Sequence, residues 1–99
     1  MKGFGGEKQS KKALKPKKLT NNLRESTIAK AFELHSQENL IDAKKYYQYF
    51  LDQGFTDPRV YSNYGEICRQ FGDKQKAEKL FKKSINLFPN SPESYSNLG

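Results

Sequence analysis

Cysteine and histidine are nearly absent from this sequence, which contains only Cys68 and His35 of these two types. One cysteine cannot form an intramolecular disulfide, and the two residues are too few for a structural zinc site. Neither residue has a partner at the spacing that a nucleophile and its base require. We expect His35 to be exposed near a helix end. We predict no metal, no cofactor and no catalytic residue, as in a protein that is not an enzyme.

Long hydrophobic runs are also missing. The longest uncharged apolar stretch is far shorter than the roughly 20 residues that a membrane-spanning helix needs. After Lys2, glycines and lysines stand where a secretory signal would have its apolar segment. We therefore expect no transmembrane segment, no export and a cytoplasmic location. With 99 residues, of which 34% are hydrophobic, the chain is long enough for one small domain.

The net charge of +7 is unevenly distributed along the chain. Residues 1–20 contain seven lysines and one glutamate, whereas residues 21–99 are almost balanced in charge. The first segment also has few apolar side chains, so burial cannot offset the entropy lost on ordering it. We predict a disordered lysine-rich tail at residues 1–20 and a folded domain at residues 21–99.

From about residue 21, apolar side chains recur at helical spacing. Segments at about 23–35 and 40–51 flank a polar break and predict one helical hairpin. Segments at about 58–71 and 77–87 predict a second hairpin, with Pro58 in the first helical turn because its missing N–H has no partner there. A fifth helix is expected to start near Pro92. The fold class is all-α, a short α-solenoid of antiparallel helix pairs.

A period of 34 residues relates the two hairpins. It separates six pairs of similar residues: Pro58 and Pro92, Tyr61 and Tyr95, Asn63 and Asn97, Gly65 and Gly99, Ala43 and Ala77, and Tyr47 and Phe81. We predict that Gly65 and Ala77 let their helices approach closely. Tyr47 and Phe50 are predicted to be core residues, while Tyr46 or Tyr49 is either a partner-facing aromatic or an ordinary surface side chain.

This pattern resembles the tetratricopeptide repeat, whose motif positions in the middle repeat are Tyr61, Tyr64, Gly65, Cys68, Ala77, Phe81, Ser84 and Pro89. The resemblance covers about two and a quarter repeats, at residues 24–57, 58–91 and an incomplete 92–99. It places Cys68 in the core. The sequence also resembles the N-terminal part of bacterial repeat arrays, some of which are joined to transferase domains. A truncated fragment of such an array is therefore an alternative interpretation.

The resemblance implies a protein-interaction module that binds a protein or an extended peptide through a concave face, formed by the first helix of each repeat. Carried over to this chain, the candidate contacts are Asn63, Asn97, Arg59, Arg69, Glu66 and Ser62. Asn63 and Asn97 occupy equivalent positions, and their carboxamides offer the donors and acceptor that pair with a peptide backbone. They resemble the asparagine ladder of O-linked N-acetylglucosamine transferases, although Ala29 breaks the series. The alternative is that both are ordinary surface residues.

Two other interpretations stay open. The lysine-rich tail is suited to weak, salt-dependent binding of nucleic acid or an anionic surface, although no aromatic residue interrupts residues 8–18 to stack on bases. Alternatively, Tyr95 and Leu98 stand on a helix that lacks a second half, which predicts self-association through an open C-terminal end.

Overall fold

The computed structural model describes residues 17–94 of the chain, with side chains described from residue 21 onward. Its elements in chain order are α2 (Lys17–Ser36), α3 (Leu40–Asp52), α4 (Pro58–Gln70), α5 (Lys74–Leu87) and the short 3-10 helix η1 (Pro92–Ser94). Residues 17–94 contain no strand, which confirms the predicted all-α class.

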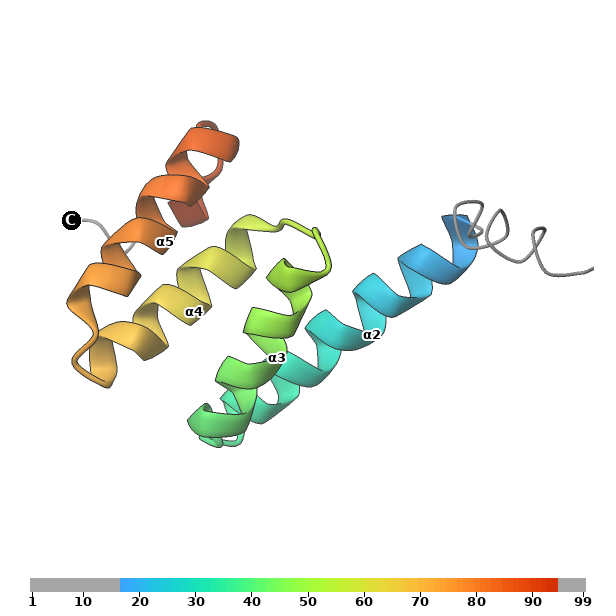
Figure 1. The fold of residues 1–99 in the computed structure, drawn as a ribbon, viewed down its shortest axis with the longest axis horizontal. Coiled ribbons are helices and arrows are strands. Elements are labelled where there is room, and N and C mark those ends of the chain that lie inside the picture. The colour runs from blue at the N-terminus through green and yellow to red at the C-terminus, as the bar shows by residue number, and fades with distance from the viewer. Residues whose placement is uncertain (1–16, 95–99) are drawn as a thin grey trace, which may run out of the picture.

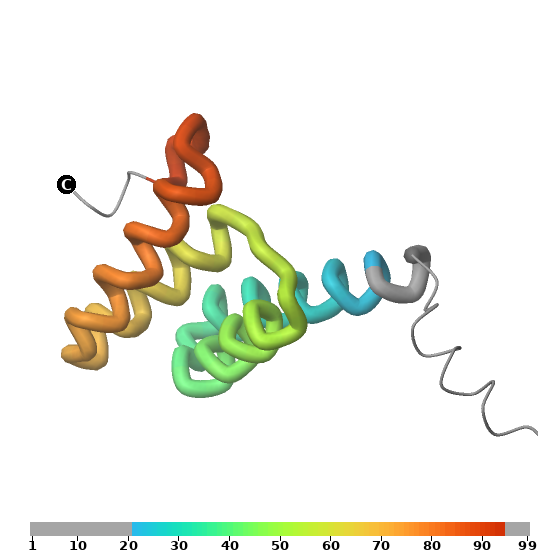
Figure 2. Tube along the Cα trace, turned by 45° about the horizontal axis from the view of Figure 1, so that its top comes forward, coloured from blue at the N-terminus to red at the C-terminus, as the bar shows by residue number. Residues whose placement is uncertain are grey.

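The helices pack as two antiparallel pairs, α2 with α3 and α4 with α5 (Figure 1). α4 also contacts α3, so the second pair stacks on the first. Figure 2 shows the same arrangement from a second angle, with α2 and α5 at opposite ends of the row. This is the predicted α-solenoid, in which each pair buries its apolar stripe against its own partner and the next pair.

Local sequence signals account for the loops between these helices. Pro58 is the first residue of α4, and the Asp57 carboxylate caps that helix by accepting the backbone N–H of Arg59 at 2.8 Å. Gly54 and Gly72 follow α3 and α4 with φ angles of 90° and 88°. Residues with a Cβ rarely adopt this left-handed backbone, so both glycines are required by the turn.

The structure corrects the predicted N-terminal boundary of the folded region. α2 begins at Lys17, so residues 17–20 are helical and do not belong to a disordered tail at 1–20. Lysine and leucine are good helix formers, and neither the charge nor the few apolar side chains that marked these residues as tail oppose the extension of a helix. The rest of that prediction concerns residues 1–16, which lie outside the described part of the chain.

At the other end, η1 occupies the start of the expected fifth helix. Ser94 is 2% exposed, and its Oγ donates to the carbonyl of Phe88 at 2.8 Å and to that of Ser84 at 3.1 Å. The turn is thereby attached to the end of α5. Tyr95 and Leu98, on which the predicted self-association depends, lie outside the described residues.

The aromatic predictions for α3 are confirmed. Tyr47 and Phe50 are fully buried, whereas Tyr46 and Tyr49 are surface residues, 38% and 42% exposed. The predicted close approach at Gly65 and Ala77 is confirmed as well. A Cβ added to Gly65 would lie 2.3 Å from Cε1 of Phe81 on α5, and Ala77 is 3% exposed. Small side chains here let α4 and α5 pack in direct contact.

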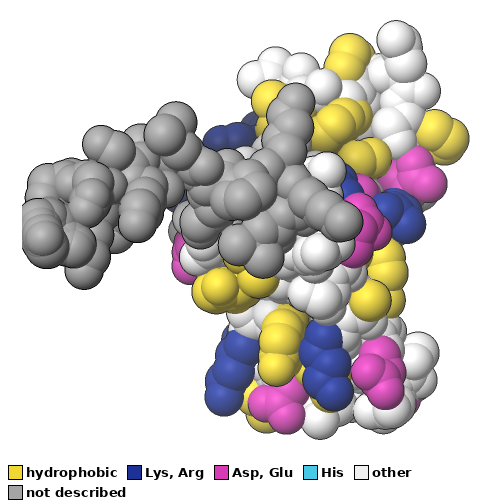
Figure 3. Space-filling view, turned by 90° about the vertical axis from the view of Figure 1, so that its right-hand side faces the viewer, with side chains coloured by type: hydrophobic (Ala, Val, Ile, Leu, Met, Phe, Trp, Pro, Cys, Tyr) yellow, Lys and Arg dark blue, Asp and Glu magenta, His cyan; other side chains and the backbone are white. Residues whose placement is uncertain are grey.

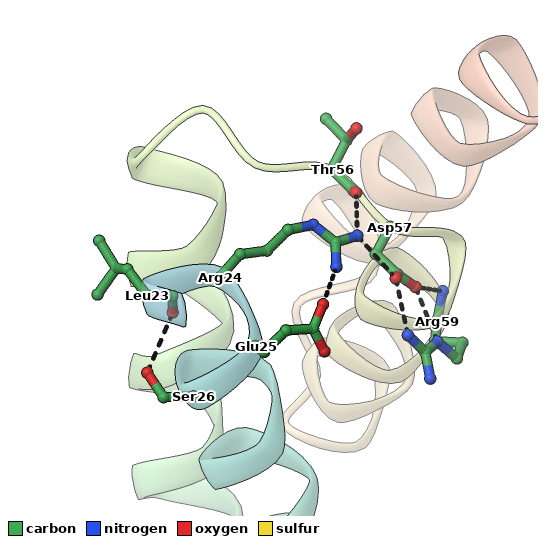
Figure 4. Close-up of polar contacts among 7 residues, drawn as sticks. All are labelled: Leu23, Arg24, Glu25, Ser26, Thr56, Asp57 and Arg59. Atoms are coloured by element: carbon green, nitrogen blue, oxygen red, sulfur yellow. Dashed lines mark hydrogen bonds and ion pairs between the residues drawn. The ribbon is translucent and has the colours of Figure 1, made fainter. Parts of the chain in front are cut away.

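A buried carboxylate joins the two helix pairs (Figure 4). Asp57 is 6% exposed and accepts Nη2 of Arg24, on α2, at 3.1 Å and Nη2 of Arg59 at 2.9 Å. Arg24 also donates to the carbonyl of Thr56 at 3.2 Å. Burial alone raises the pKa of Asp57, but hydrogen bonds from Arg59 and Arg24 outweigh it and lower the pKa. These contacts orient the start of α4 relative to α2.

Candidate peptide-binding face

α2 and α4 are the first helices of their pairs, and side chains from both surround a shallow hollow. The hollow has a volume of about 280 Å³ and is lined by Phe32, His35, Ser36 and Asn63. We call these four residues the inner groove. It combines an aromatic side chain with hydroxyl, imidazole and carboxamide groups, so it offers both an apolar contact and hydrogen-bonding groups to a ligand.

Asn63 is connected to the core through the hydroxyl of Tyr47. That hydroxyl lies 2.9 Å from Nδ1 of His35, and it accepts a hydrogen bond from the Asn63 side chain. Burial raises the pKa of Tyr47 to about 12, and the bond from Asn63 opposes this shift. Tyr47 therefore keeps its proton at neutral pH. A carboxamide has two N–H donors and a carbonyl acceptor, so a bond to Tyr47 leaves Asn63 with capacity for a peptide backbone.

Arg59 forms one end of the same face. Its guanidinium donates to both oxygens of Asp57, with Nε to Oδ1 at 3.0 Å and Nη2 to Oδ2 at 2.9 Å. The same group lies 5.2 Å from the ring centroid of Phe32. Hydrogen bonds and charge from Asp57 raise the pKa of Arg59. Arg59 is half exposed, and its planar guanidinium is held in place by the Asp57 carboxylate and the Phe32 ring. It would therefore lose little conformational entropy on contacting a ligand.

Ser62 does not belong to this surface, which corrects its prediction as a contact residue. It is only 7% exposed. The resemblance placed it on the concave face of α4, but a serine is small enough to be enclosed where helices pack. Its polarity therefore did not indicate exposure.

Glu66 and Arg69 are on the surface of α4, as predicted, but they form an ion pair with each other. Gln70 also donates to Glu66, at 3.4 Å. A ligand that binds either charge competes with this pair. Asn97, the other predicted rung of an asparagine ladder, lies outside the described residues.

Three residues of the inner groove, Phe32, His35 and Ser36, are not among the predicted contacts, although the resemblance places all three on the concave face of the first repeat. His35 was expected to be exposed, but it is half-buried and bonded to Tyr47. The burial of His35 could have been predicted from the register of the α2–α3 hairpin, because antiparallel packing brings the end of α2 against the middle of α3. The sequence pattern identified Phe32 as an apolar residue of the helix. The packing of Arg59 against its ring shows that Phe32 also contributes to this surface.

Residues 17–94 contain few side chains that are suited to nucleophilic chemistry or metal binding. Cys68 is 3% exposed, as its predicted core position requires, and burial raises the pKa of its thiol. In this part of the chain no three His, Cys, Asp or Glu side chains are grouped to hold a metal ion. Among the same residues, no helix has the length and hydrophobicity to cross a membrane.

The tetratricopeptide repeat family model matches residues 58–91, which are α4, α5 and the turn that follows. The chain therefore contains a tetratricopeptide repeat. The match has the boundaries predicted for the middle repeat. Since α2 and α3 form the same kind of pair beside it, the chain is a helical repeat solenoid of this type. Tetratricopeptide repeats are protein-interaction modules, so the general class of function is protein binding.

The chain has a relative in Escherichia coli strain K12, the uncharacterized protein YgeG. The two sequences are 30% identical over 71 residues, which is 72% of this chain and 44% of YgeG. The chain thus spans less than half the length of this relative. No solved structure matches the chain.

Proposed function

We propose that the protein binds an extended segment of a partner protein in the inner groove, without catalysing a reaction on it. The observation that carries this proposal is the position of Asn63 in a hollow beside Phe32, with its carboxamide oriented by Tyr47. In this arrangement Asn63 pairs with a backbone amide of the ligand, and Phe32 contacts a neighbouring apolar side chain. The tetratricopeptide repeat supports the general class, a protein-interaction module.

The other predicted contacts have supporting roles in this proposal. Arg59 faces an acidic or carbonyl group of the ligand with the N–H groups that Asp57 does not use. Glu66 and Arg69 contact polar side chains at the rim, and Asn97 continues the series in the third repeat. We propose repeats at residues 24–57, 58–91 and 92–99, and a cytoplasmic location, as the setting of this interaction.

The test begins with peptides selected from a random display library on the 99-residue protein. The affinity of a selected peptide is then measured by fluorescence anisotropy. Asn63→Ala should weaken binding about threefold to tenfold, the range expected for one net hydrogen bond of about 0.5 to 1.5 kcal/mol. Gln75→Ala, an exposed change on α5, is the matched control and should leave the affinity unchanged. Unaltered binding by Asn63→Ala, with folding preserved by circular dichroism, would contradict the proposal.

A second comparison separates groove binding from charge attraction by the N-terminal lysines. A variant without residues 1–16 retains the whole of α2 and should keep the peptide affinity and its dependence on Asn63. Adding Asn97→Ala to Asn63→Ala should weaken binding further if both are rungs of one ladder. If deletion of residues 1–16 abolishes binding, the inner groove is not the site.

A further inference from the structure

A second, larger depression lies on the other side of α4, between α3 and α5. Two adjoining hollows of about 430 and 410 Å³ share Gln48 and Lys76 in their linings, and we call them together the outer groove. Tyr61 and Tyr64 of α4 line it, about 200° around the helix from Asn63 and Glu66. The outer groove is therefore separate from the inner groove.

The side chains that line the outer groove are strongly biased in charge. Five are lysines: Lys44, Lys45, Lys76, Lys79 and Lys83. The only carboxylate among the lining residues is Asp52, and it accepts a hydrogen bond from Gln48 at 2.8 Å. By contrast, the lower part of the face drawn in Figure 3 shows basic side chains with acidic side chains near them. The outer groove thus concentrates positive charge that the whole domain does not show.

The three lysines of α5 that line the groove follow one side of that helix, at positions i, i+3 and i+7. Lys76 already contacts other residues of the domain, because its Nζ donates to Gln48 at 3.2 Å and lies 5.1 Å from the Tyr64 ring centroid. Lys79 and Lys83 are exposed, and neither forms an ion pair with another described residue. Their ammonium groups therefore remain available to an anionic ligand.

Between the lysines the groove is apolar. Leu51, Phe55 and Leu80 contribute to its lining, and the long aliphatic stems of the lysines extend this surface toward the rim. A ligand that fits must bring apolar side chains to the floor and negative charges to the edges. An extended peptide does this when the two types alternate, since successive side chains point to opposite sides.

The groove favours such a peptide over nucleic acid for two reasons. Three tyrosines line the groove, and two of them, Tyr61 and Tyr64, are 3% and 2% exposed and present no ring face on which a base stacks. Among these tyrosines only Tyr49, 42% exposed, offers a ring, so successive bases have no series of rings to stack on. No arginine lines the groove, so the bidentate guanidinium contact to phosphate is absent there. Leu51 and Leu80 instead match aliphatic side chains.

We propose that the outer groove is a second docking site, which takes an extended acidic peptide whose carboxylates alternate with apolar side chains. Lys79 and Lys83 bind the carboxylates, which lie about 6.6 Å apart at alternate residues of a strand. These lysines are one helical turn apart, or about 6 Å along α5, so the two spacings agree. This inference does not depend on the proposed role of the inner groove.

The probe is the fluorescein-labelled peptide Asp-Leu-Glu-Phe-Glu-Leu-Asp, titrated with the full chain in about 0.15 M salt, where long-range attraction is screened. Lys79→Gln combined with Lys83→Gln should weaken its binding about tenfold, since two exposed ion pairs are lost. The matched control is Lys74→Gln with Lys82→Gln, on the same helix and with the same loss of charge, and it should change the affinity less than about twofold. The N-terminal lysines are identical in both variants.

Several outcomes would overturn the proposal. Equal weakening by the two double variants would show attraction by net charge alone, and so would equal binding of a peptide with serine in place of leucine and phenylalanine. Absence of binding by the wild-type chain would also refute it. If a single-stranded oligothymidylate binds more tightly than the peptide and is weakened by the same pair of substitutions, the groove is a nucleic-acid site. Asn63→Ala should leave binding of this probe unchanged, which keeps the test separate from that of the inner groove.

Discussion

Replacing Gly65 by alanine tests a close contact between α4 and α5. Alanine is the better helix former, so on α4 alone the change would stabilise the protein by about 0.8 to 1 kcal/mol. The new Cβ, however, would lie 2.3 Å from Cε1 of Phe81 and 2.8 Å from its Cδ1 and Cζ. Carbon atoms pack best at about 3.5 to 4 Å, so the ring would have to move by more than about 1 Å.

Phe81 has little room for that movement, because it is only 6% exposed and belongs to the core. Overpacking of this kind costs about 1 to 3 kcal/mol, and so short a contact places Gly65→Ala near the upper end. After subtracting the gain in helix propensity, we expect a net loss of about 2 kcal/mol in the free energy of unfolding. The melting temperature should fall by about 8 to 16 °C in a domain of this size.

The assay is urea denaturation followed by far-ultraviolet circular dichroism. Ala29→Gly, at an exposed position of α2, measures the helix-propensity difference in this protein and should cost about 1 kcal/mol. Phe81→Leu should remove much of the clash, so the double variant with Gly65→Ala should lose less stability than the sum of the single variants. If Gly65→Ala alone stabilises the protein by about the amount measured at Ala29, the close contact is refuted.

Two further predictions concern buried ionisable groups. The pKa of Asp57 lies below its ordinary value of 3.8 in the folded protein. As the pH falls, the unfolded chain therefore binds a proton at this residue before the folded chain does. The stability that the Asp57 carboxylate contributes should be complete above about pH 4 and should be lost as the pH falls through the lowered pKa. The variant Asp57→Asn retains a helix cap but lacks the charge. Between about pH 5 and pH 2 its melting temperature should therefore change less than that of the wild type. An equal change in both proteins would contradict this role of Asp57. Cys68 is buried and the pKa of its thiol is raised, so labelling of this thiol requires local opening of the structure. Its reaction with Ellman's reagent should therefore be about a hundredfold or more slower in the native protein than in denaturant. Rapid labelling of the native protein would show that Cys68 is accessible.

Much of the fold could be predicted from residue patterns because those patterns act locally. Apolar residues at helical spacing indicated the helix pairs, and Pro58 and Gly72 mark where a helix begins or ends. The 34-residue period then related one pair to the next. The start of α2 was the exception, because the tail was predicted from its charge and its few apolar side chains, and neither prevents a helix from continuing outward from the folded part.

The candidate site could be predicted only in part. The resemblance assigned Arg59, Asn63 and Glu66 to one face of α4, and residues separated by about one turn do lie on the same side of a helix. The resemblance assigned Ser62 to the same surface, but the packed helices enclose it. Whether a small polar side chain is buried depends on what packs over it, and that information lies elsewhere in the chain.

The sequence by itself determined the class of this protein, an all-α helical repeat domain, because helix periodicity and turn residues are properties of neighbouring residues. Tertiary structure alone decided the contacts between distant residues. It paired Arg24 with Asp57, joined His35 to Asn63 through Tyr47, and gathered lysines from α3 and α5 around one groove. The total charge of residues 21–99 concealed that last feature, because a sum over the sequence is independent of where folding places each charge. Binding surfaces are made by such placements, so they follow from the packing of the helices against one another.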